Sequence, residues 1–108
     1  MDNVNICFQL EGLGLHVLVS DYGIVSAIKI IGNDEITYEV KEYSNKEKIM
    51  IDLSLNNTYI FKAVNDNLHA FTINYALSLY HLKHHISILK EKHYESSKRG
   101  VRRSQPNH

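Results

Sequence analysis

Residues 68–95 contain neither proline nor glycine, and this uninterrupted stretch constrains the fold more than any other feature of the chain. Its apolar residues recur every three or four positions, which is the period of one helix face. This apolar stripe consists of Leu68, Phe71, Tyr75, Leu79, Leu82, Ile86 and Leu89. Asp66 and Asn67 come directly before it, and short polar side chains of this kind cap helix N-termini. We therefore predict one long helix over residues 67–95, roughly 40 Å in length at 1.5 Å per residue.

The first half of this predicted helix carries a second apolar face. Its members lie on the side away from the stripe at 100° per residue, and they are Ile73, Ala76, Leu77 and Tyr80. A helix that is apolar on two faces is covered on both. Two alternatives follow: residues 55–65 fold over the second face, or another protein chain binds it. We favour a protein partner, and these four residues are the candidate partner-binding residues.

The first half of the chain predicts short strands separated by turns. Alternating or continuous apolar runs predict strands at residues 4–10, 15–19, 24–31, 35–42 and 49–53, whereas residues 59–64 are ambiguous between strand and helix. Gly32-Asn33-Asp34 lies between two alternating runs and is the strongest hairpin signal. We expect an α+β fold with a small antiparallel β-barrel or curved sheet of five to six strands over residues 1–64. One long C-terminal helix completes a single domain over residues 1–95, and a basic, disordered and flexible tail follows over residues 96–108.

Part of the strand region resembles SH3-like small β-barrels. The resemblance is carried by His16-Val17-Leu18-Val19, by Asp21-Tyr22-Gly23-Ile24-Val25 with Ile28, and by Ile36-Thr37-Tyr38-Glu39-Val40. Those barrels often show an apolar strand, a glycine turn, a V-x-x-I strand and a Y-x-V strand in this order. The resemblance covers roughly residues 15–53 and implies a barrel that binds peptides, nucleic acid or larger assemblies. A groove for proline-rich peptides is not implied, because the chain contains no tryptophan.

Charge is balanced over the whole chain but unevenly placed along it. Residues 1–82 carry five lysines against ten acidic residues, whereas residues 83–108 carry seven basic residues against two acidic ones. The candidate anion-binding or nucleic-acid-binding residues at this basic end are Lys90, Lys92, Lys98, Arg99, Arg102 and Arg103. They suit either phosphate groups or an acidic protein surface. The tail has no aromatic side chain to stack on bases, so nucleic-acid binding would be independent of base sequence.

Four of the seven histidines lie within the predicted helix between residues 80 and 93. His81 and His85 are i, i+4 neighbours, a spacing that can hold a divalent metal ion. The zincin pattern needs a glutamate after the first histidine, and Leu82 occupies that position. Two ligands do not make a tight site, so the sequence favours a polar helix face made of Asn74, His81, His85 and Lys92. Metal binding, and an extension of the basic surface when the histidines are protonated, are the two alternatives.

The sequence carries no motif of a catalytic site: there is no Ser-x-Gly elbow, phosphate loop or Cys/His pair. Gly12-x-Gly14 precedes a predicted strand rather than a helix, which argues against dinucleotide binding. Cys7 is the only cysteine, which excludes an internal disulfide, and it lies in an apolar run typical of a buried small side chain. No apolar run reaches the roughly 18 residues of a membrane span, and the start lacks the basic region of a secretory signal. We therefore expect a soluble, cytoplasmic protein.

These features predict a small non-catalytic interaction subunit that needs no cofactor and docks on a protein partner or a second copy through its helix. Bacterial and phage accessory factors, inhibitors, immunity proteins and assembly subunits are built on this scale. The alternative function is a nucleic-acid-binding accessory protein that works through the basic helix end and tail.

Overall fold

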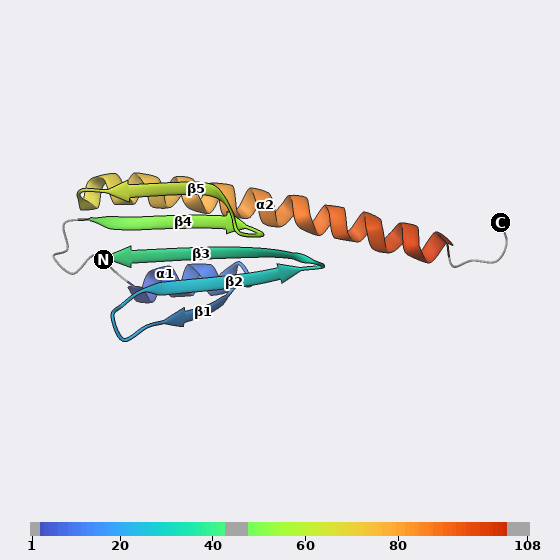
Figure 1. The fold of residues 1–108 in the computed structure, drawn as a ribbon, viewed down its shortest axis with the longest axis horizontal. Coiled ribbons are helices and arrows are strands. Elements are labelled where there is room, and N and C mark those ends of the chain that lie inside the picture. The colour runs from blue at the N-terminus through green and yellow to red at the C-terminus, as the bar shows by residue number, and fades with distance from the viewer. Residues whose placement is uncertain (1–2, 43–47, 104–108) are drawn as a thin grey trace.

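The computed structural model describes residues 3–42 and 48–103, and for residues 95–103 it describes the backbone alone. The elements in chain order are α1 (Asn3–Gly12), β1 (His16–Val19), β2 (Val25–Ile31), β3 (Asp34–Glu42), β4 (Ile49–Leu55), β5 (Thr58–Asn65) and α2 (Leu68–Arg103). The five strands form one antiparallel sheet in the order β1-β2-β3-β4-β5 (Figure 1). The predicted α+β fold, a sheet followed by one long helix, is confirmed. The sheet is open with β1 and β5 at its edges, so the closed barrel is not formed, and the SH3-like resemblance stays a prediction.

Both helices cover the same face of the sheet (Figure 1). α1 packs on β1 and β2, and α2 packs mainly on β4 and β5. Between them and the sheet lies the core, to which the strands contribute Val25, Ala27, Ile31, Ile36, Tyr38, Val40, Ile49, Ile51 and Leu53. These residues share one face because side chains alternate along a strand and the strands are paired in register, as Val25 with Val40 and Val40 with Ile51. Within the described residues, no element covers the opposite face, where Ile28 and Ile30 are exposed.

The first segment is a helix, so the strand predicted over residues 4–10 is wrong. A period-two pattern also contains an i, i+4 pattern, and the pair Ile6 and Leu10 satisfies both. In α1 these two side chains are buried, whereas Val4 and Phe8 lie 80% and 77% exposed. The apolar alternation therefore divides into a core-facing pair and an exposed pair, which the sequence pattern alone could not separate.

The end of α1 explains the Gly-x-Gly sequence. The Gly14 N–H donates to the Glu11 carbonyl at 2.9 Å, and the Leu15 N–H donates to the Leu10 carbonyl at 3.1 Å. Together these bonds form a Schellman motif, which requires a residue with positive φ, and Gly14 has a φ of 85°. The two glycines are therefore a helix-end signal, and this signal could have identified α1 in the sequence.

Short turns set the register of the sheet. Gly32 has a φ of 62° and joins β2 to β3, as the hairpin signal predicted. Asn56 and Asn57 have φ values of 49° and 67°, the pair of positive angles that a type I′ turn between β4 and β5 requires. The ambiguous residues 59–64 therefore belong to a strand. The turn expected between the strands predicted at residues 35–42 and 49–53 falls mainly on residues 43–47, which lie outside the described residues.

α2 begins where the sequence predicted and continues further than predicted. The Asn67 side-chain oxygen accepts a hydrogen bond from the Ala70 N–H at 2.8 Å, which confirms the expected N-cap. With 36 residues, α2 is about 54 Å long, and its C-terminal part extends past the end of the sheet (Figure 1). The helix continues beyond the expected end at residue 95. The predicted tail falls on the backbone-only part of α2 and on residues 104–108, which lie outside the described residues, so its flexibility stays a prediction.

The predicted stripe of α2 faces the core except at its first member. Four of its residues are buried, namely Phe71, Leu82, Ile86 and Leu89, while Tyr75 and Leu79 are half-buried. Leu68 is 61% exposed, because it lies in the first turn, ahead of the first residue that reaches the core. The orientation of α2 about its axis is therefore the one that the sequence predicts.

Candidate protein-docking surface

The side of α2 turned away from the core exposes a cluster of apolar side chains. Ile73, Leu77 and Tyr80 are 51%, 46% and 66% exposed, and Ala76 beside them is exposed too. We call these four residues the α2 outer face. The alternative in which residues 55–65 fold over them is wrong, because those residues complete β4 and form β5 within the sheet. These are the four residues that the sequence predicts to bind a partner.

A buried hydrogen bond between β3 and α2 fixes which face of the helix turns outward. The Ser78 hydroxyl donates to the Tyr75 carbonyl at 2.7 Å and lies 2.6 Å from the Tyr38 hydroxyl. Because the Ser78 proton is already used, the Tyr38 hydroxyl is the donor of the second bond. Burial raises the pKa of Tyr38, so it stays protonated and able to donate. A rotation of α2 would leave the buried Tyr38 hydroxyl without its Ser78 partner, so this bond stabilises the observed orientation.

Two further polar contacts hold the first half of α2 in place. The Asn74 amide donates to the Asn65 side-chain oxygen at 2.6 Å, and the buried Asn65 amide donates to the Ile49 carbonyl at 2.9 Å. On the other side of the helix, the Tyr75 hydroxyl donates to the Gln9 side chain of α1. α2 is thus tied to β5 on one flank and to α1 on the other, and the α2 outer face between them becomes a fixed surface.

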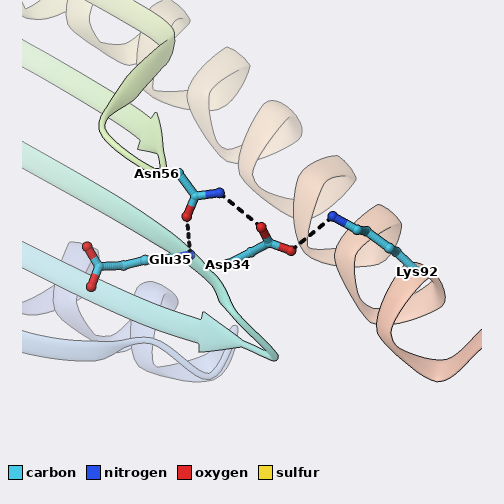
Figure 2. A network of polar contacts seen from close by, with 4 residues as sticks. All are labelled: Asp34, Glu35, Asn56 and Lys92. Atoms are coloured by element: carbon cyan, nitrogen blue, oxygen red, sulfur yellow. Dashed lines mark hydrogen bonds and ion pairs between the residues drawn. The ribbon is translucent and has the colours of Figure 1, made fainter. Parts of the chain in front are cut away.

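A polar cluster holds the distal part of α2 to the sheet (Figure 2). The Asp34 carboxylate accepts a hydrogen bond from the Asn56 amide at 2.9 Å. It also forms an ion pair with the Lys92 ammonium group at 3.4 Å. The Asn56 side-chain oxygen in turn accepts from the Glu35 N–H at 2.8 Å. These contacts join the β2–β3 turn, the β4–β5 turn and α2, so the helix is anchored along the whole length of the sheet.

This cluster predicts a pH effect that centres on Asp34. The Asn56 hydrogen bond, and then Lys92, lower the pKa of Asp34, so the folded state binds a proton less readily than the unfolded state, where the pKa is about 3.9. The stabilisation is therefore complete above about pH 5 and is lost as the pH falls through the folded-state pKa. We expect Asp34→Asn to lose less stability between pH 5 and pH 3 than the wild type, as measured by urea unfolding. Asp21→Asn, in the exposed β1–β2 turn, is the control, and an equal acid effect in all three proteins would contradict the prediction.

The helical histidines take part in ring contacts near the α2 outer face. The His81 ring lies 5.4 Å from the Phe61 ring of β5, and the Tyr80 and His84 rings stack with 6.3 Å between centroids. Burial, and then the neighbouring histidines, lower the pKa of His85. Among the residues whose side chains are described, no three metal-binding side chains come together. The contact with Phe61 places the His81 side of α2 next to β5.

The structure separates the predicted basic residues into two groups. Lys90 and Lys92 are both exposed, and Lys92 also forms an ion pair with Asp34. The side chains of Lys98, Arg99, Arg102 and Arg103 lie outside the described residues. Binding of an anion or of nucleic acid by this end of α2 therefore stays a prediction.

The sequence left residues 59–64 ambiguous, and the structure makes them part of the edge strand β5, on which α2 packs. β5 pairs with β4 alone, and its Tyr59 and Val64 side chains are 58% and 52% exposed. Lys62 is the only charged residue in β5, and no Asp, Glu, Lys or Arg occurs between Asp66 and Lys83. That gap in charge was visible in the sequence and marks the neutral half of α2. The candidate surface thus combines a neutral helix face with a strand edge.

Comparison of the chain with protein families, with curated proteins and with solved structures finds no match. In the part of the chain that the structure describes, no helix has both the length and the apolarity that crossing a membrane requires.

Proposed function

We propose that this protein is a non-catalytic interaction subunit that binds a protein partner through the α2 outer face. The observation that carries the proposal is the exposure of Ile73, Leu77 and Tyr80 on a helix that is already anchored to its own core by its opposite side. An apolar cluster on a fixed element is a preformed surface, because little side-chain or backbone order has to be gained on binding.

The composition of this surface supports a protein as the partner. The cores of protein interfaces are depleted in charge and enriched in aromatic residues, and tyrosine is frequent among the residues that dominate binding energy. The α2 outer face has Tyr80 at one end and lies within the uncharged stretch of α2. Fully burying one large apolar side chain stabilises by about 1.5–3 kcal/mol, so three half-exposed ones contribute several kcal/mol to an association.

The test places a charge on this surface. We expect Leu77→Asp and Tyr80→Asp to abolish the complexes that the full chain forms, because each would bury an unpaired carboxylate. Both proteins should keep the wild-type circular dichroism spectrum and unfold cooperatively, since the replaced side chains are exposed. The measurement is the molecular mass of the purified full chain and of the complexes it forms in extracts of its own cells.

Thr72→Asp is the matched control, because it adds the same charge to an exposed position in the same half of α2 but off the outer face. It should leave the complexes intact. If Leu77→Asp and Tyr80→Asp both unfold the protein, the face belongs to the core and the proposal fails. It also fails if both variants form the same complexes as the wild type.

A further inference from the structure

We propose that the partner is a second copy of this chain, joined about a two-fold axis with β5 against β5 and α2 against α2. This inference rests on the proposed function, because it uses the α2 outer face, and it adds the identity of the partner. Two observations carry it. The edge of β5 is unprotected, and the uncharged stretch of α2, which packs on β5, has an acidic residue at one end and a basic residue at the other.

The β5 edge lacks most of the features that keep sheet edges from pairing. Proteins protect edges with very short strands, prolines, several charges or a covering element. The other edge strand, β1, has four residues, and α1 packs beside it. β5 has eight residues, no proline and one charge. Its pairing with β4 is shifted near Ile60, and the stretch from Phe61 to Asn65 then pairs regularly, which leaves a regular edge of backbone groups for another strand.

A second β5 strand suits this edge because antiparallel pairing about a two-fold axis lets one surface patch bind its own equivalent. The same axis places the two α2 helices on one face of the joined sheet, running in opposite directions. The His81 ring rests on Phe61 of β5, and Leu77 lies one helical turn earlier on the same side. Leu77, the member of the α2 outer face on this β5 side, therefore lies towards the second α2 helix when the β5 edges pair.

We call the part of α2 that carries its outer face the neutral patch. The charges at the two ends of this patch are complementary when two α2 helices run in opposite directions. The patch is neutral from residue 67 to residue 82, with Asp66 at one end and Lys83 at the other. When two α2 helices run in opposite directions, the acidic end of each lies towards the basic end of the other. A self-association through the patch thus brings no like charges from α2 together at its centre and sets opposite charges at both ends.

The experiment measures the mass of the full chain by sedimentation equilibrium and follows the dimer dissociation constant in variants. We expect the wild type to be twice its chain mass of 12.5 kDa at micromolar concentration. Leu77→Asp tests the helix contact, and Val64→Lys tests the strand contact by placing a second lysine beside Lys62 on the β5 edge. Each should weaken the dimer by about 100-fold or more. Tyr22→Lys, in the exposed β1–β2 turn, is the matched control and should leave the dimer unchanged.

The outcomes separate this inference from the proposed function. If the wild type stays monomeric at concentrations about 100 times above the micromolar range, the second copy is not the partner. The proposed function still stands in that case if Leu77→Asp abolishes a complex with another protein. A dimer that Leu77→Asp breaks and Val64→Lys leaves intact overturns the pairing of β5. A dimer that neither variant affects overturns both the pairing of β5 and the binding of a partner through the α2 outer face. Circular dichroism of each variant ensures that the loss of the dimer is not a loss of fold.

Discussion

Replacing Leu82 by alanine is expected to lower the free energy of unfolding by about 3 kcal/mol, because a fully buried leucine loses its transfer free energy and leaves a cavity. Leu82 is 0% exposed and lies in the core cluster between α2 and the sheet. Leu77, which is 46% exposed on the opposite side of the same helix, is the matched position. Leu77→Ala should cost less than about 1 kcal/mol.

The measurement is urea unfolding of both variants, with the midpoint compared at a constant slope of free energy against denaturant. Because the proposed function includes association, the wild type and both variants are compared at a chain concentration at which all three are monomeric. Equal losses from Leu82→Ala and Leu77→Ala in the monomer would mean that the two faces of α2 are assigned wrongly.

The second large effect is expected from Ser78→Ala, which should cost about 2 kcal/mol of stability. It removes the acceptor of the Tyr38 hydroxyl, which is buried and then has no partner. Tyr38→Phe removes the donor instead and should cost about 1 kcal/mol, because the Ser78 hydroxyl keeps its bond to the Tyr75 carbonyl. Each change is measured by urea unfolding at neutral pH.

The double variant provides the control for this pair. With both hydroxyls removed, no buried group is left unpaired, so the double variant should cost less than the two single changes together. Strict additivity would show that the two hydroxyls do not stabilise each other. The bond would then contribute nothing to the orientation of α2 that exposes its outer face.

The position of the candidate surface followed from the sequence because a long helix with two apolar faces obeys one period along its whole length. The stripe and the second face differ by about half a turn, and the structure buries the first and exposes Ile73, Leu77 and Tyr80 of the second. The positions of β2, β3 and β4 could also be predicted from the sequence, because core-facing and outward-facing residues largely alternate along these strands and glycine or asparagine occupies the turns.

Other features depend on contacts between distant residues, which a local pattern does not contain. α1 was missed because Ile6 and Leu10 satisfy both the strand and the helix period, and only the Schellman motif at Gly14 distinguishes them. Ser78 and Asn65 are buried polar residues whose partners lie on other elements. The sequence left a closed barrel and a curved sheet as alternatives, because strand spacing does not say whether the first and last strands pair; here they form opposite edges of an open sheet.

The simple strand order has a consequence for how the chain acquires its structure. Because each strand pairs with the next one in sequence, the sheet forms by closing loops of a few residues, and the entropy lost in each closure is small. The contacts that α2 makes with the first half of the chain join distant segments instead, as in the bonds between Gln9 and Tyr75 and between Tyr38 and Ser78. Pairing between strands that are neighbours in sequence favours rapid folding, so β1 to β4 spend little time as unpaired strands.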